Sequence, residues 1–134
     1  MTAFAAVLYY VLWTIVLVLI YAVPRVPLAL FTDRTIDSWE RNKPVNDAPF
    51  FQRAKGAHLN SLENLPAFAV VVIIATLMGK SAVVDGLACY VLYARVAQSV
   101  VHLIGNSSAL VPPRAILFVA QVLLVAYMAL MLLH

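Results

Sequence analysis

Three side chains with complementary chemistry stand in one stretch near the middle of the chain. Arg53 precedes Asn60 by seven residues, and Glu63 follows Asn60 by three. These spacings put the three residues on one face of a helix. The sequence turns apolar directly after them, where a polar group is costly unless it is paired or faces a cavity. The pattern predicts a polar wall on which Asn60 and Glu63 hold an amide and an ammonium group.

The next apolar stretch carries a second polar series with the same period. Arg95, Gln98 or Ser99, and His102 stand at positions i, i+3 or i+4, and i+7 of one helix. Arg95 lies in the middle of this stretch, too deep in a bilayer to be stable while it faces lipid. We expect the two series to face each other across a pocket between two helices.

The predicted pocket is basic, because Arg53, Arg95 and Arg114 are available to it. A basic pocket that opens to the cytoplasm suits an anionic cytosolic ligand. A structural interpretation also stays open, in which Glu63 and Arg95 form an ion pair that joins the two helices. The two interpretations are compatible, since such a pair can form one wall of a site.

The elements that position these residues follow from the composition. Hydrophobic residues make up 64% of the 134 residues and charged residues 11%, whereas a soluble domain has roughly 45–50% and about 25%. Four runs approach the length of about 20 residues that crosses a bilayer, and turns rich in Pro and Gly separate them. The sequence predicts an all-α integral membrane four-helix bundle, one domain over residues 1–134 with spans at about 3–23, 58–79, 82–105 and 114–133.

Most of the positive charge falls in the loop that joins the first two spans. This loop, residues 24–57, holds six of the nine Lys and Arg residues: Arg25, Arg34, Arg41, Lys43, Arg53 and Lys55. The positive-inside rule places the loop in the cytoplasm and both termini on the opposite side. A polar loop of this length is either disordered or caps a site, and its direct connection to the polar wall favours the cap. We expect a bacterial inner (plasma) membrane as the location.

Two motifs can be read from the second and third spans. The second span gives Arg53-Ala54-x-x-Ala57-His58-x-Asn60-x-x-Glu63-Asn64-x-Pro66-x-Phe68, and the third gives Ala94-Arg95-Val96-Ala97 followed by His102. Both resemble motifs of the MAPEG family, the membrane-associated proteins in eicosanoid and glutathione metabolism, in a prokaryotic-type member. The resemblance covers the whole chain, including the number of spans and the long first loop.

The resemblance implies a homotrimer in which glutathione, as co-substrate, binds between neighbouring subunits near the cytoplasmic side. The implied glutathione-binding and supporting residues are Arg53, His58, Asn60 and Glu63. The implied catalytic residues are Arg114, which stabilises the glutathione thiolate, with Arg95 and His102. The implied function is a membrane-bound glutathione transferase or peroxidase that acts on lipophilic electrophiles or lipid hydroperoxides.

The chain departs from the family pattern at a few positions. Several members carry a tyrosine where this chain has His102 and an arginine where it has Gly56. Ala115 and Phe118 follow Arg114, where some members place a hydroxyl residue. These departures disfavour the eicosanoid-specific reactions. His102 can replace the tyrosine as a donor or as an acid–base group, or it is a hydrogen-bonded histidine at a helix end.

Two other function classes remain open on the residues alone. One is a non-catalytic lipid- or amphiphile-binding membrane protein with the same fold, and the other is a small transporter subunit that uses Arg95 and Glu63. A metal site is not expected, because His58 and Glu63 are five residues apart and point to different helix faces. The net charge of +3 follows from the basic loop, so no nucleic-acid partner is expected.

Overall fold

The fold is all-helical over the part of the chain that the structure, a computed structural model, describes. This part comprises residues 1–40, 47–105 and 107–134, and its regular secondary structure is entirely helical. Four of its helices are long and apolar enough to cross a membrane. The all-α, four-helix prediction is therefore confirmed. Arg41 and Lys43 of the predicted loop lie outside the described residues.

Each long helix reaches across a hydrocarbon core of roughly 30 Å, since a helix rises about 1.5 Å per residue. The shortest of them, α1, has 20 residues. The long helices are α1 (Ala3–Ala22), α3 (Pro49–Leu77), α4 (Ser81–Ile104) and α5 (Val111–Leu133). Between them lie the short helix α2 (Arg25–Phe31) and two 3₁₀ turns, Ile36–Trp39 and Ser108–Leu110.

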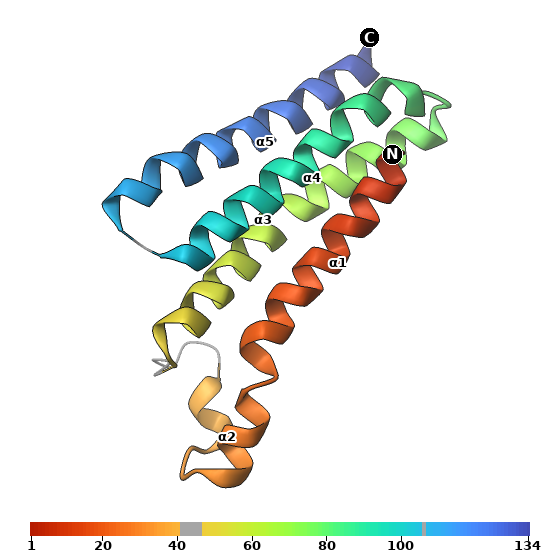
Figure 1. Ribbon diagram of the computed structural model, residues 1–134. Coiled ribbons are helices and arrows are strands. Elements are labelled where there is room, and N and C mark those ends of the chain that lie inside the picture. Colours follow the sequence, from red (N-terminus) through yellow and green to blue (C-terminus); the bar gives the residue numbers. More distant parts are fainter. Residues whose placement is uncertain (41–46, 106) are drawn as a thin grey trace.

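The four long helices lie side by side along a common direction (Figure 1). Helices α3 and α4 form the middle of the bundle, with α1 (red) on one flank and α5 (blue) on the other. Both chain termini lie at one end of the bundle, and α2 lies beyond the opposite end. This placement agrees with four successive crossings that return the chain to the side on which it started.

Helix α3 begins earlier than the apolar pattern predicts. It starts at Pro49 rather than near residue 58, and Pro49 occupies the first helical turn, where its missing N–H costs nothing. The sequence prediction followed hydropathy, which falls before Asn60, whereas the helix continues through polar residues to its natural start. Residues 49–57 of the predicted loop are therefore helical, and the described part before them contains α2 and a 3₁₀ turn.

The core of the bundle is built from large side chains set between small ones. Tyr10 and Phe68 are fully buried, with ring centroids 5.8 Å apart. Ala6, Ala75 and Ala88 are also fully buried, and small residues of this kind let transmembrane helices approach closely. The outer faces of the helices remain apolar, as expected for surfaces that contact lipid rather than water.

A hydrogen bond fixes the start of α1 to α4. The backbone N–H of Ala3 donates to Oδ1 of Asp85 at 2.8 Å. This amide is one of the four that a helix N-terminus leaves without an intrahelical acceptor, and a carboxylate there also favours the helix dipole. This hydrogen bond explains why an acidic residue, Asp85, lies within an apolar span.

We expect Asp85→Ala to lower the free energy of unfolding by about 1 kcal/mol, the usual contribution of a capping hydrogen bond. Asp85→Asn keeps an oxygen acceptor and should lose less. Thermal unfolding of the detergent-solubilised protein measures both. Equal stability of the Ala variant and the unaltered protein would show that the contact contributes nothing.

The segment beyond the end of α1 folds into a cap whose centre is Asp47. Oδ1 of Asp47 accepts from Trp39 Nε1 at 2.9 Å and from Arg34 Nη1 at 3.0 Å, and Oδ2 pairs with Arg25 at 3.4 Å. The Arg34 guanidinium also stacks over the Trp39 ring, 4.4 Å from its centroid. Burial opposes ionisation, but these hydrogen bonds and guanidinium charges outweigh it and hold the pKa of Asp47 below its usual value.

The lowered pKa of Asp47 makes the cap sensitive to acid. A carboxyl whose pKa is lower in the folded state stabilises it fully above its ordinary pKa of about 3.9, and this stabilisation is lost as the pH falls through the folded-state value. In a Trp13→Phe variant, the fluorescence of Trp39 should therefore change below about pH 4. Asp47→Asn should show the acid-type signal at every pH. A pH step that persists in the Asn variant would assign it to another group.

Candidate functional site

A polar hollow lies between α3, α4 and α5 at the end of the bundle that carries the cap. Asn60 and Glu63 from α3 line it together with Gln98 from α4 and Arg114 from α5. Its volume is about 350 Å³, and Val111, Ala115 and Phe118 complete its lining. The structure thus brings together three residues that the sequence analysis assigned to a site: Asn60, Glu63 and Arg114.

The hollow presents both signs of charge to a ligand. Glu63 supplies a carboxylate and Arg114 a guanidinium, while Asn60 and Gln98 supply amides. Among the described residues, neither Glu63 nor Arg114 has an oppositely charged partner within ion-pair distance. Both charges are therefore free to pair with a ligand, and a zwitterion with amide groups is the chemical complement of this lining.

A buried amide pair holds the wall between α4 and α5 in place. Gln121 Nε2 donates to Gln98 Oε1 at 2.8 Å and also to the backbone carbonyl of Leu117 at 2.9 Å. Gln121 is fully buried, and Gln98 is 4% exposed. The pair fixes the orientation of the Gln98 side chain, which lines the hollow.

Arg53 ties the start of α3 to the end of α4. Its Nε donates to the carbonyl of Leu103 at 2.9 Å, and its guanidinium lies 5.9 Å from the centroid of the Phe50 ring. Two turns further along α3, the Asn60 Nδ2 atom lies 3.3 Å from Nδ1 of His102. Two of the predicted site residues, Arg53 and His102, therefore lie beside the hollow and join the helices that form it.

Arg95 lies in the core rather than in the lining of the hollow. It is fully buried, and its guanidinium lies 5.8 Å from the centroid of the Tyr10 ring. Among the described residues, no group accepts a hydrogen bond from its three side-chain nitrogens. The alternative of a Glu63–Arg95 ion pair is not realised, because no contact within 4.0 Å joins these two described residues.

His58 points toward α1 and away from the hollow. Its Nδ1 lies 2.9 Å from the hydroxyl oxygen of Tyr21, and the centroids of the two rings lie 5.7 Å apart, with the rings tilted by 49°. Among the predicted glutathione-binding residues, His58 is thus the one that the structure places on another face of α3. A contact with the last turn of α1 makes it a residue that positions the helix.

The polar hollow adjoins an apolar groove along the seam of α3 and α5. Asn64, one turn beyond Asn60, begins a stretch of about 400 Å³ that is otherwise lined by Ala67, Val70, Val71, Val122, Val125, Ala126 and Ala129. A further hollow near Met78 and Leu133 continues the seam toward the far end of the bundle. A polar reactant in the hollow and a lipophile in the groove can therefore meet where the lining changes from polar to apolar.

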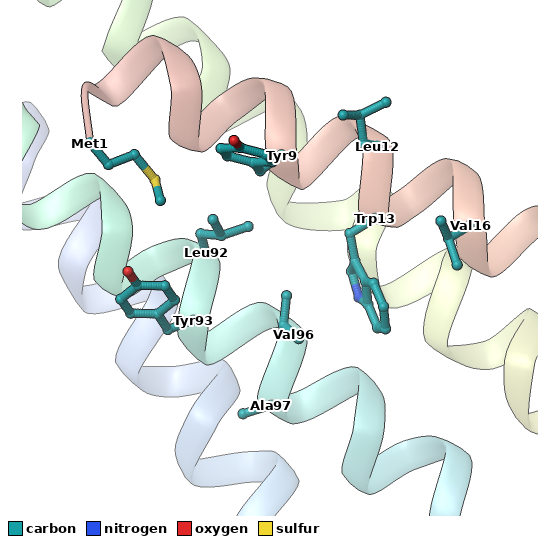
Figure 2. A pocket seen from close by; sticks show the side chains of 9 residues that line it. All are labelled: Met1, Tyr9, Leu12, Trp13, Val16, Leu92, Tyr93, Val96 and Ala97. Carbon is teal, nitrogen blue, oxygen red and sulfur yellow. The ribbon is translucent and has the colours of Figure 1, made fainter.

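A larger hollow lies elsewhere, between α1 and α4 (Figure 2). It measures about 690 Å³, and Figure 2 shows Trp13 reaching from α1 toward α4 at one end of it. None of its nine lining side chains is charged. This hollow has the character of the lipid-facing surface and contains none of the predicted site residues.

Sequence reasoning missed the contribution of Gln121 and left the pocket role open between Gln98 and Ser99. The signal was present, because Gln121 is the one strongly polar residue of the last apolar run. A polar residue in such a run must find a partner on another helix. Gln98 was one of two candidates in its series, and periodicity alone could not choose between it and Ser99.

The fold and the hollow define a class: a four-helix integral membrane protein with a polar site near one end of its bundle. The chain belongs to the MAPEG family, whose model matches residues 2–134. Comparisons with curated proteins and with solved structures give no match. Membership makes the chain a membrane-embedded four-helix bundle of the family of glutathione and eicosanoid metabolism.

The Gln98–Gln121 pair can be tested by removing one or both amides. We expect Gln121→Leu to destabilise the protein by roughly 1–3 kcal/mol, because the amide of Gln98 loses its buried partner. The double variant Gln98→Leu/Gln121→Leu should recover most of this loss, since no buried amide is then left unpaired. Thermal unfolding in detergent measures the cycle, and additive losses would contradict a direct bond.

Proposed function

We propose that this protein is a membrane-bound glutathione-dependent transferase or peroxidase that acts on lipophilic electrophiles or lipid hydroperoxides. The observation that carries the proposal is the hollow in which Arg114 faces Asn60, Glu63 and Gln98 in a chain of the MAPEG family. Family membership supports glutathione as the co-substrate, and the unpaired charges of the hollow match its zwitterionic peptide character.

Most groups of glutathione have a partner in or beside the hollow. In this proposal the ammonium group pairs with the Glu63 carboxylate, and peptide groups bond to the amides of Asn60 and Gln98. Arg53 attracts a carboxylate from the rim. Arg114 remains for the thiol, the one group of glutathione whose charge must be created for the reaction.

The proposed role of Arg114 is to stabilise a thiolate. A free thiol has a pKa of about 8.5, and a guanidinium in contact favours the anion. Transfer then proceeds by attack of the thiolate sulfur on an electrophilic carbon, with a C–S bond formed and the leaving group expelled with the electrons of its bond. The thiol proton goes to solvent at the open side of the hollow.

The same thiolate can reduce a hydroperoxide. Its sulfur attacks the terminal oxygen, the O–O bond breaks, and the alkoxide takes a proton to become an alcohol. The glutathione is left as a sulfenic acid, which a second glutathione converts to a disulfide with release of water. The apolar seam of α3 and α5 supports a lipid as the substrate, because it adjoins the hollow.

Arg95 and His58 enter the proposal as positioning residues, since neither lines the hollow. Arg95, on α4, is buried beside Tyr10 of α1 and contributes its charge from there, while His58 holds the end of α1 through Tyr21. We further propose a homotrimer in a bacterial inner membrane. The cap, the hollow and the basic loop then face the cytoplasm, where glutathione is found, and the termini lie opposite.

Arg114→Ala should reduce the thiolate absorbance of glutathione bound to the purified protein in detergent. Loss of an adjacent guanidinium raises a thiol pKa by roughly 1–3 units, so the thiolate fraction at neutral pH falls about tenfold or more. Arg114→Lys should keep part of the signal, because an ammonium retains the charge but not the planar fork. Ultraviolet difference spectroscopy over a pH series measures all three proteins.

Lys80→Ala serves as the matched control, because it removes a cation at the opposite end of the bundle and should leave the thiolate signal unchanged. No glutathione binding at millimolar concentration would overturn the proposal. Binding without a thiolate would indicate a non-catalytic amphiphile binder. Uptake by reconstituted vesicles would instead support a transporter subunit.

A further inference from the structure

The contact between Asn60 and His102 fixes which way the Asn60 amide is turned. The two atoms in contact are Nδ2 of Asn60 and Nδ1 of His102, at 3.3 Å. An amide nitrogen can only donate, so Nδ1 accepts and the neutral ring carries its proton on Nε2. The amide oxygen Oδ1 is then the acceptor that Asn60 keeps for a ligand in the hollow, beside the second N–H of Nδ2.

The His102 ring reaches this position because residue 56 has no side chain. A Cβ atom placed on Gly56 would lie 2.9 Å from His102 Nε2 and 3.0 Å from Cε1. Distances this short do not occur between real Cβ atoms and their neighbours, so any side chain at residue 56 would move the ring. Gly56 precedes Asn60 by one helical turn, so both lie on one face of α3 and the ring contacts both.

Glycine at this position is unfavourable for the helix itself. A helix-interior glycine stabilises α3 less than alanine does, and the helical conformation of Gly56 does not require a glycine. Packing against the imidazole is therefore the physical reason for a glycine here.

We propose that Gly56 is the socket of the His102 ring and that the seated ring orients the Asn60 amide, so that the hollow selects a ligand that donates an N–H group there. Gly56 and His102 are positioning residues in this arrangement, because they act on the ligand through Asn60. The inference rests on the proposed function for the identity of the ligand, glutathione, whose amide and ammonium groups are N–H donors. The orientation of the ring and the amide does not depend on it.

The test moves the ring without removing it. Gly56→Ala adds a single methyl group against the far end of a side chain, which can swing away without unfolding the helix. The ring then leaves Asn60, the amide is free to turn, and glutathione affinity should fall by about fivefold to tenfold, the effect of one hydrogen bond. Isothermal titration of the detergent-solubilised protein with glutathione measures this loss.

Gly86→Ala is the matched control. Gly86 is also an interior helical glycine, but a Cβ atom there meets nothing within 4 Å. Both variants gain the same helix propensity, so a difference between them reports the contact with His102. Equal affinities of the two variants would overturn the proposal.

A double-mutant cycle shows whether the loss passes through the ring. His102→Ala should weaken glutathione binding about as much as Gly56→Ala does. In the His102→Ala background no ring is left to displace, so adding Gly56→Ala should change the affinity by less than about twofold. A loss of the same size in both backgrounds would show that residue 56 acts by another route, and the proposal would be wrong.

Nitrogen NMR of the histidine side chains separates failure of this inference from failure of the proposed function. The ¹⁵N signals of His102, assigned with the His102→Ala variant, should show a neutral ring with an unprotonated Nδ1 in the absence of any ligand. Gly56→Ala should shift these signals and Gly86→Ala should not. If the Gly86→Ala protein fails to bind glutathione, the proposed function fails. The NMR result then decides the inference alone, since unshifted signals in Gly56→Ala would refute it.

Discussion

The structure depends on one constraint: a polar group among apolar helices is costly unless it finds a partner or faces a cavity. The chain satisfies this at three levels of the bundle. At one end, Asp85 accepts a hydrogen bond from the first amide of α1. Within the bundle, Gln98 and Gln121 form a hydrogen bond. At the other end, Asp47 accepts hydrogen bonds from the residues of the cap. With the helices held in this way, Glu63 and Arg114 face a shared hollow without cancelling each other.

The helices and part of the site could be predicted because both follow from periodicity. Apolar runs of bilayer length leave few alternatives to a transmembrane helix, and spacings of three and seven residues set which side chains share a face of α3. Periodicity cannot give the rotation of one helix against its neighbours. That rotation is set by packing, here by Tyr10 and Phe68 between small residues, and it turned Arg95 into the core and His58 toward α1.

Hydropathy could not predict the cap or the early start of α3, and the reason is a different one. Both are made by polar residues whose partners are distant in sequence or supplied by the fold: Arg25 with Asp47, and Arg53 with the carbonyl of Leu103. The departure of Gly56 from the family pattern was visible in the sequence, but its link to His102 was not. Only the approach of α4 to α3 shows that the two positions occupy one space.

The burial of Arg95 lowers the stability of the fold, because a fully buried guanidinium without a hydrogen-bond acceptor among the described residues has a large desolvation free energy. Such a cost in stability is tolerated where a charge acts through its electrostatic potential at a distance and not through direct contact. Apolar surroundings screen a charge far less than water does, so Arg95 adds positive potential to the neighbouring hollow across α3 and α4. In the proposed site, an anion bound beside Arg114 is then stabilised by two guanidinium groups, that of Arg114 in contact with it and that of Arg95 from the core.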